Sequence, residues 1–547
     1  MSGRDGAGRT TDRGGTARRT RSRAVAATAC AGLVGTLAIA GSTPSQASTA
    51  SAQLWLAQGS GKTVVERFPG EPLFLDTGAY VVAGSQAVRL DVSRPSYKDS
   101  VRGVQVISSH GARTTRNLPK GAVKDFSGLQ GFFSVTVAKS GRTVARRTLP
   151  FCPNGYDVQR ARPDAPDASP YPADCTANPF SRGAVWGLQA GWSTSAAGDP
   201  FQSPKNALKL RDGTYTVTTT IAPRYRAFFG VPAKRATVVT SMKVVTAREG
   251  DPRGGLRAGT SQTSQTSQTS TSTPTLGHAP TGRNAVPVAG PRPDLQALPA
   301  WGFRVENNST GEGEEAGPRA ARPRRDYLDF AATVWNAGPS QLVVNGFRRP
   351  GTKVMDAYQY FYDVHGRQVS YAKVGTMRYD GRASHQHWHF KDFARYALVA
   401  ADKKTLVVDS GKEAFCLANT DMVDYTVKGA NWKPENTDLS TACGDREALG
   451  VREVLDPGSG DTYTQYREGQ AFDLTGVANG TYYIRVAANP DKVLYEGSRK
   501  NNVSLRKVVL GGTKNHRTVV VAKVGVVDEP PVEDEDEDED EGEARRR

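Results

Sequence analysis

The chain has 547 residues, of which 37% are hydrophobic and 8% aromatic, so it can form several packed domains. Its single long apolar run lies at the N-terminus, which excludes a polytopic membrane protein. The formal net charge is +16, but the positive charges are scattered and form no recognisable DNA- or RNA-binding module. Nucleic acid is therefore not an expected partner.

The first 48 residues have the organisation of a secretory signal peptide. Seven arginines lie among the first 23 residues, an apolar stretch follows at 24–41, and the small residues at 42–48 are typical of a cleavage zone. An N-terminal membrane anchor is the alternative, but it would require a longer and more apolar segment. We expect a secreted protein, extracellular or associated with the cell surface, with no membrane span after signal cleavage.

Export would leave four cysteines in the mature chain, in two local pairs that lie far apart in the sequence. Outside the cell such pairs usually form disulfides. Four thiols allow three connectivities. The expected division into domains favours Cys152–Cys175 and Cys416–Cys443.

Residues 49–248 contain short runs of alternating polar and apolar side chains between glycines and prolines. Alternation with a period of two, together with β-branched residues, is typical of strands with one buried face. We therefore predict a β-sandwich-like module, in which the Pro- and Asp-rich stretch 164–178 is a loop cross-linked by Cys152 and Cys175. The clearest predicted strands are 87–92, 131–137 and 214–221.

Residues 249–292 are predicted to be a disordered linker, because their Ser-Gln-Thr repeat and Ser/Thr-rich continuation have too little apolar surface to fold. A second β domain is expected at 293–512. Residues 513–547 end in a self-repelling Asp/Glu run and are predicted to be a disordered acidic tail. The expected fold class is all-β throughout. The clearest strands of the second domain are 329–335, 397–401, 405–408, 482–487 and 502–508.

Three of the seven histidines lie within five residues, as His385, His387 and His389. On a strand, every second side chain points to the same side, whereas on a helix the middle imidazole would point roughly 200° away from the first. We therefore predict an extended or bent strand whose imidazoles hold one metal ion. Three imidazoles with no nearby thiolate suit Cu(II), Zn(II) or Fe(II). A row of surface histidines is the structural alternative.

Two other mononuclear sites fit the same residues. A cupin-like site would use His385, His387, a carboxylate such as Asp392 and a later histidine, for which only His516 is available. A zinc hydratase or hydrolase of the carbonic-anhydrase type is also chemically consistent with three imidazoles. Asp392 is a candidate general base or a partner that orients an imidazole, with an ordinary surface aspartate as the alternative.

The residues 385–392, His-Gln-His-Trp-His-Phe-Lys-Asp, resemble the copper-binding strand of the lysyl oxidase family. Further segments resemble that family in the same order along the chain, and together they cover about 293–512. Five ordered segments make the resemblance specific, which the histidine triplet alone would not do. The other segments are Pro293-Asp-Leu295, Ser410–Leu417 with its lysine, Asp461-Thr-Tyr463 with Asp473, and Gly480–Pro490 with Glu496 and Asn501-Asn502.

The resemblance implies a copper-dependent amine oxidase with a β catalytic domain. Copper would be held by His385, His387 and His389. Lys412 and Tyr463 would form the cofactor lysyl tyrosylquinone, which arises when copper and oxygen oxidise the tyrosine and the lysine amine adds to its ring. Such an enzyme uses O2 to deaminate primary amines, including lysine side chains of proteins, to aldehydes. Hydrogen peroxide and ammonia are released.

The sequence departs from the family in two respects. The interval between Lys412 and Tyr463 is longer than in animal members, so an insertion is expected at about 428–456. The usual partners of Cys416 and Cys443 are absent, which supports a bond between these two cysteines.

Some members of the family bind calcium between the Pro-Asp-Leu motif and the Asn-Asn pair. Asp294, Asn501 and Asn502 keep the corresponding oxygen ligands here, but Ser498 stands where the family has a carboxylate. Because fewer ligands are charged, we expect any calcium to bind weakly.

A function of another class also accounts for the sequence: a metal-binding matrix or adhesion module that keeps the fold but never forms the quinone. A covalent link between the peptides that carry Lys412 and Tyr463 would distinguish the oxidase from this alternative.

Overall fold

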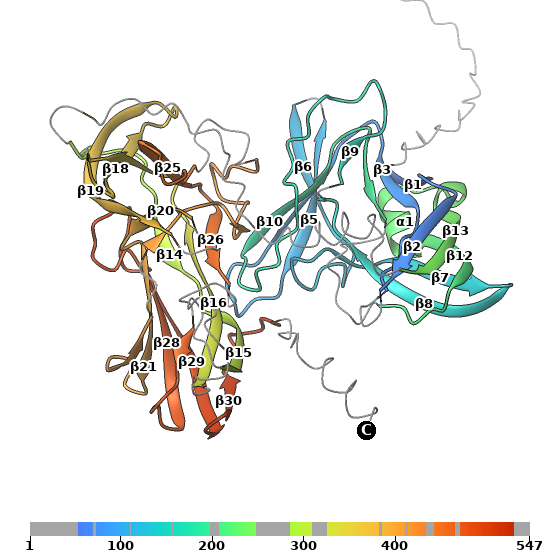
Figure 1. Ribbon diagram of the computed structural model, residues 1–547. Coiled ribbons are helices and arrows are strands. Elements are labelled where there is room, and N and C mark those ends of the chain that lie inside the picture. Colours follow the sequence, from blue (N-terminus) through green and yellow to red (C-terminus); the bar gives the residue numbers. More distant parts are fainter. Residues whose placement is uncertain are drawn as a thin grey trace, which may run out of the picture. The chain divides into compact units, whose positions relative to one another are not determined.

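The computed structural model shows an all-β chain, as predicted (Figure 1). Every residue that it describes belongs to one compact unit, Ala50–Arg547. The predicted signal peptide, most of the predicted linker and the acidic run of the tail lie outside the described residues. The described residues are 53–68, 73–109, 111–155, 157–196, 207–247, 280, 285–308, 325–349, 351–381, 386–410, 414–433, 442–464 and 471–529.

The N-terminal module is built from thirteen strands and, within its described residues, two short helices, α1 (Pro223–Phe229) and the 3-10 helix η2 (Ala233–Arg235). The strands are β1 (Leu54–Gln58), β2 (Lys62–Arg67), β3 (Ala79–Ala83), β4 (Val88–Ser93), β5 (Arg102–Ser109), β6 (Ala112–Asn117), β7 (Leu129–Lys139), β8 (Arg142–Phe151), β9 (Gln159–Arg160), β10 (Gly183–Leu188), β11 (Trp192–Ser195), β12 (Gly213–Ile221) and β13 (Thr237–Thr246). They form three sheets, in the orders β1-β3-β11-β9, β10-β4-β5-β6 and β2-β13-β12-β7-β8.

The predicted alternation of side chains explains these strands. In β12, Tyr215, Val217, Thr219 and Ile221 are buried at every second position, so they face the core, while the threonines that alternate with them are more exposed. The three predicted runs correspond to β4, β7 and β12. Phe132 and Trp186 are fully buried in the same core. Replacing such a ring by alanine typically costs about 3–5 kcal/mol of stability.

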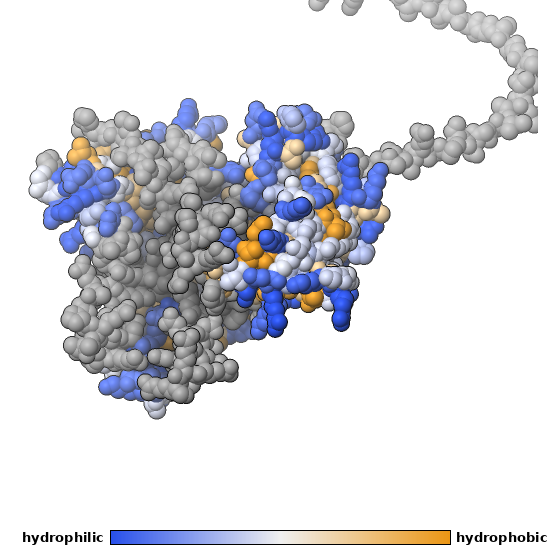
Figure 2. All heavy atoms as spheres, turned by 45° about the vertical axis from the view of Figure 1, so that its right-hand side comes forward, coloured by the Kyte–Doolittle hydropathy of each residue, from blue (hydrophilic) through white to orange (hydrophobic). Residues whose placement is uncertain are grey.

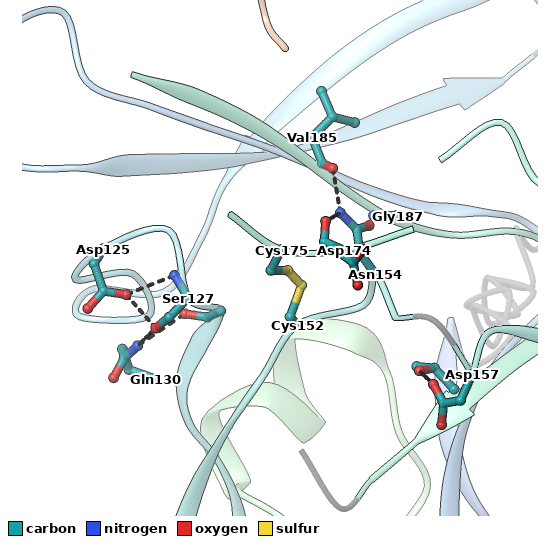
Figure 3. The surroundings of a disulfide bond; sticks show 12 residues. Asp125, Ser127, Gln130, Cys152, Asn154, Asp157, Asp174, Cys175, Val185 and Gly187 are labelled. Atoms are coloured by element: carbon teal, nitrogen blue, oxygen red, sulfur yellow. Dashed lines mark hydrogen bonds between the residues drawn. A yellow bond between two sulfur atoms is a disulfide. The ribbon is translucent and has the colours of Figure 1, made fainter. Parts of the chain in front are cut away.

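A disulfide joins Cys152 to Cys175, as predicted, with 6.3 Å between their Cα atoms. Figure 3 shows Asn154 beside it, in contact with β10. The Asn154 amide donates to the carbonyls of Asp174 (2.9 Å) and Val185 (3.0 Å), and its oxygen accepts the N–H of Gly187 (2.8 Å). The Pro- and Asp-rich loop is therefore fixed to the sheet by a covalent bond and by a fully used buried amide.

The second domain forms three further sheets around its own core. Its strands are β14 (Leu295–Ala297), β15 (Trp301–Asn308), β16 (Arg325–Asn336), β17 (Leu342–Arg348), β18 (Val354–Tyr362), β19 (Gln368–Asp380), β20 (His387–Lys391), β21 (Ala394–Ala400), β22 (Leu406–Asp409), β23 (Ala414–Phe415), β24 (Asp421–Met422), β25 (Gly450–Leu455), β26 (Ser459–Tyr463), β27 (Phe472–Asp473), β28 (Gly480–Ala488), β29 (Val503–Thr513) and β30 (His516–Val521).

Two of these sheets meet at the predicted site. One has the order β14-β16-β26-β24, with β15 and β27 also paired to β16, and the other has the order β23-β20-β19-β18-β17-β25. The third, β22-β21-β28-β29-β30, completes the domain. The predicted strands at 329–335, 397–401, 405–408, 482–487 and 502–508 correspond to β16, β21, β22, β28 and β29.

The structure corrects the predicted start of the acidic tail at residue 513. β29 continues to Thr513, and β30 pairs with it antiparallel from Thr513↔His516 to Val508↔Val521. The run His516–Val521 has alternating intermediate and exposed side chains, as expected for an edge strand. This strand is short, and the long acidic run that follows it dominates the composition of the C-terminal stretch.

Apolar and hydrophilic side chains are interspersed on the face of the molecule drawn in Figure 2. Exposed valines such as Val64, Val144 and Val239 belong to β2, β8 and β13 of one sheet. No helix among the described residues is both long and apolar enough to cross a membrane.

Asp329 gives the second domain a pH-dependent stability. Its side chain is buried on β16, 3.2 Å from the Arg304 guanidinium, and burial followed by the charge of Glu306 raises its pKa to about 7. Between about pH 4 and pH 7 the folded protein therefore holds a proton that the unfolded chain has lost. The free energy of unfolding should fall as the pH rises through this window, by up to about 1.4 kcal/mol per pH unit from this group.

Urea unfolding at pH 5 and pH 8, followed by tryptophan fluorescence, measures this dependence. Asp329→Asn cannot titrate, so its loss of stability over the same interval should be smaller than that of the unmodified protein. Equal losses in the two proteins would contradict the assignment to Asp329.

Candidate functional site

The histidine segment is an extended strand, as predicted for the part that the structure describes. His387 and His389 lie on β20 with ring centroids 4.7 Å apart, and His389 is only 2% exposed. Trp388 and Phe390 alternate with them and are packed in the core of the domain. The apolar residues therefore anchor the strand and turn both imidazoles to the opposite face. The first residue of the predicted triplet, His385, lies outside the described residues.

A carboxylate from the neighbouring strand lies beside these imidazoles. β19 pairs with β20 so that Asp380 is opposite His387, and Asp380 Oδ2 lies 3.5 Å from Nδ1 of His389. A carboxylate at one ring nitrogen fixes the ring and directs the other nitrogen toward a metal. Asp380 was not predicted from the sequence. Its position could have indicated this role, since Asp380 ends β19 and only a short connection separates it from the histidine strand β20.

Asp392, the carboxylate singled out from the sequence, has a different environment. It follows β20 in a left-handed backbone conformation (φ 64°), and its nearest ion-pair partner is Arg395 at 3.9 Å. His516, the distant histidine of the cupin-like alternative, is exposed on β30 in another sheet. The structure therefore does not bring together the described members of the cupin-like set.

The segment that follows Lys412 pairs directly with the histidine strand. β23 lies antiparallel to β20, with Phe415 opposite Phe390 and Ala414 opposite Lys391. Lys412 itself lies outside the described residues, two positions before β23.

The predicted second disulfide follows immediately, between Cys416 and Cys443 with Cα atoms 6.0 Å apart. This bond links the lysine segment to the chain that supports the histidine strand. Trp388 donates its backbone N–H to the Cys443 carbonyl (3.1 Å) and its indole N–H to the Asp445 carbonyl (2.9 Å).

Tyr463 is the last residue of β26 and packs against the segment that follows Lys412. Its ring meets the edge of the Phe415 ring with 4.7 Å between centroids, and it is hydrogen-bonded to the Cys416 backbone. Burial and the nearby groups Asp461, Tyr396 and Glu453 raise its pKa well above the usual value, so the phenol is protonated at neutral pH. Tyr463 therefore lies against the two residues that join the lysine segment to the histidine strand.

Glu453 of β25 holds two of these segments together. Its side chain is completely buried, and its two oxygens accept the N–H groups of Phe390 (3.0 Å) and Leu417 (3.1 Å). Burial raises its pKa well above the usual value, while the two N–H donors oppose this rise. One side chain thus sets the spacing between the histidine strand and the chain after Cys416. Its role could not be read from the sequence, where it is one of many Asp and Glu residues.

The residues predicted to bind calcium lie together, although they come from the start and from the end of the second domain's sequence. Asp294 Oδ2 accepts the Asn501 amide (2.9 Å), and the Asn502 amide donates to Glu496 Oε1 (2.9 Å). Glu496 also accepts the N–H of Leu295 (3.0 Å). The side-chain oxygens of both asparagines are buried and accept no hydrogen bond from the described part of the chain.

A metal-binding group of three or more His, Cys, Asp or Glu side chains is absent from the described residues, which include two of the three clustered histidines.

A family model described as lysyl oxidase matches residues 365–520, which contain the histidine strand, Lys412 and Tyr463. The chain is 30% identical over 126 residues to the protein-lysine 6-oxidases of Sus scrofa and Homo sapiens, and 31% identical over 126 residues to lysyl oxidase homolog 1 of Homo sapiens. The chain carries a lysyl oxidase family domain. These matches cover 23% of the chain and 44%, 26% and 19% of the three relatives, so it spans less than half the length of each.

The matched residues begin inside the second β domain. β14 to β18, which precede residue 365, pack in the same core as β20 and β26. The whole N-terminal module also lies outside the matched residues.

Proposed function

We propose that the protein is a secreted amine oxidase that depends on copper and on lysyl tyrosylquinone formed from Lys412 and Tyr463. It converts a primary amine, O2 and water into an aldehyde, ammonia and hydrogen peroxide, with the lysine side chains of proteins among its substrates. His385, His387 and His389 would hold copper. The two disulfides support an oxidising, extracellular location.

The observation that carries this proposal is the position of Tyr463. Its ring and hydroxyl contact Phe415 and Cys416, and Phe415 pairs with Phe390 of the histidine strand. Tyr463 thus lies beside the segment that follows Lys412, and that segment pairs with the histidine strand, although the three come from separate parts of the chain. Formation of the quinone requires that the tyrosine and the lysine segment lie together.

The described residues fit the two groups. His387 and His389 present neighbouring imidazoles on one face, and Asp380 orients the buried one, which suits copper. Copper and the quinone would supply the two-electron oxidation and the reduction of O2. The chain's own residues orient and shield: Phe415 packs on the Tyr463 ring and is itself contacted by Tyr396, and burial keeps the Tyr463 phenol protonated.

We also propose that Asp294, Asn501 and Asn502 hold a calcium ion. The unpaired buried oxygens of both asparagines and the nearby Glu496 support this proposal, since calcium takes carboxylate and amide oxygens. Calcium would tie the start of the domain to its last long strand.

Mass spectrometry of a proteolytic digest tests the proposed function. After copper loading in air, we expect a cross-linked peptide that contains Lys412 and Tyr463, reactivity with phenylhydrazine, and hydrogen peroxide release on a panel of amines that a copper chelator prevents during maturation. Two separate, unmodified peptides without carbonyl reactivity would favour a metal-binding matrix or adhesion module. Tight zinc binding with hydratase or hydrolase turnover would favour a zinc enzyme.

A further inference from the structure

The N-terminal module is joined to the lysyl oxidase domain by main-chain hydrogen bonds. At the start of β10, the N–H groups of Arg182 and Gly183 donate to the Val423 carbonyl (2.6 and 3.1 Å), and the Gly183 carbonyl accepts the N–H of Tyr425 (2.9 Å). Ser181 adds a side-chain bond to the Met422 carbonyl (2.7 Å). The chain just after β24 therefore continues a sheet of the other module.

The two modules also share apolar cores. Met422 and Tyr425, which follow the lysine segment, are buried within the core of the N-terminal module, with Trp432 packed against it. A tether that merely connects two independent domains would not remove side chains of one domain into the core of the other. A separate buried cluster spans both modules and consists of Phe180, Leu298, Trp335, Val423 and Val527.

A buried polar network links the N-terminal module to the strand of Tyr463. The Asn178 amide, 2% exposed, donates to Thr333 Oγ1 (2.9 Å) on β16 and to Asp421 Oδ2 (3.3 Å) on β24. Thr333 is bonded in turn to Thr462 (2.7 Å), and the Thr462 hydroxyl donates to Asp421. Thr462 directly precedes Tyr463, so the network ends one residue before the proposed quinone residue.

The position of β26 explains why this contact matters. β26 lies between β16 and β24, and β24 is only two residues long. β24 is held on one side by β26 and on the other by the N-terminal module, through the bonds around Val423. Without the module, Asp421 would lose its Asn178 partner, and the short β24 would be the unsupported edge of the sheet. A buried carboxylate deprived of a donor is costly.

We propose that the N-terminal module is a permanent structural part of the oxidase site, and that Asn178 is a positioning residue for Tyr463. This inference rests on the proposed function for its catalytic meaning, but the association that it requires can be measured without any cofactor. It contrasts with a module that serves as a spacer or is discarded on activation.

Cleavage of the full chain tests the association. A specific protease site placed in the predicted linker, within residues 261–269, allows the purified protein to be cut. We expect the two fragments to elute together in gel filtration until denaturant is added, with the melting temperature unchanged. Fragments that separate in buffer, with the C-terminal fragment keeping its melting temperature and quinone content, would overturn the proposal.

Two matched variants test the positioning role. Asn178→Leu removes the donor to Thr333 and Asp421, whereas Asn154→Leu removes an equally buried asparagine whose bonds stay inside the N-terminal module. Hydrogen exchange of the β26 amides, Ser459–Tyr463, should be at least fivefold faster in Asn178→Leu and unchanged in Asn154→Leu. The quinone content per folded protein should fall in Asn178→Leu and stay unchanged in Asn154→Leu.

The two readouts separate this inference from the proposed function. If no quinone forms in the unmodified protein, the proposed function fails, while fragment association and β26 exchange still decide the role of the module. Equal exchange in the Asn178 variant, the Asn154 variant and the unmodified protein would refute the positioning role of Asn178.

Discussion

Replacing Tyr463 by phenylalanine is expected to abolish hydrogen peroxide release on every amine, a loss on the order of a thousandfold or more. Phenylalanine lacks the oxygen that must become part of the quinone, so the group that accepts the substrate's electrons cannot form. The fold should survive, because phenylalanine keeps the ring that packs on Phe415. The hydrogen bond with the Cys416 backbone is lost, which costs about 0.5–1.5 kcal/mol.

Tyr466→Phe is the matched control, since this tyrosine lies three residues further on and could be mistaken for the cofactor residue in the sequence. It should keep its peroxide release and the cross-linked peptide. Turnover that persists in Tyr463→Phe and disappears in Tyr466→Phe would show that Tyr463 has been wrongly assigned. Both proteins should bind copper, which a metal analysis of the purified variants would verify.

The second large effect is expected from Glu453→Gln. A glutamine has the same size, but its NH2 group cannot accept a hydrogen bond, so the N–H of either Phe390 or Leu417 is left unpaired in the core. An unpaired buried group costs about 1–3 kcal/mol. Because Glu453 sets the spacing between the histidine strand and the lysine segment, quinone formation should also slow, by about tenfold to a hundredfold.

Time courses of phenylhydrazine-reactive carbonyl after copper addition measure this rate, and thermal unfolding measures the loss of stability. Glu447→Gln is the control, because Glu447 is exposed three residues before β25. A Glu453 variant that is less stable but matures at the normal rate would limit this carboxylate to a role in folding. A Glu453 variant indistinguishable from Glu447→Gln in both measurements would contradict the proposed role of Glu453 in holding the two segments together.

Local sequence patterns predict the class of fold and much of the candidate site. Alternation of side chains marked β12 and β28, because the burial of one face of a strand is recorded at every second residue. The two disulfides followed from the local pairing of four cysteines. The strand conformation of His387 and His389 followed from their spacing, since only an extended chain can turn both imidazoles to one side. Each of these inferences depends on residues that are close in the sequence.

The contacts between polar groups on different strands become visible in the folded chain and not in the sequence. Asp380, Glu453 and Asn178 act through partners on other strands, and Asn178 reaches Asp421 across 243 residues of chain. Such partners depend on the order and register of the strands. The alternation of polar and apolar residues in one strand does not specify these, because the same pattern fits beside many different neighbouring strands. The attachment of the N-terminal module to β24 was hidden for the same reason.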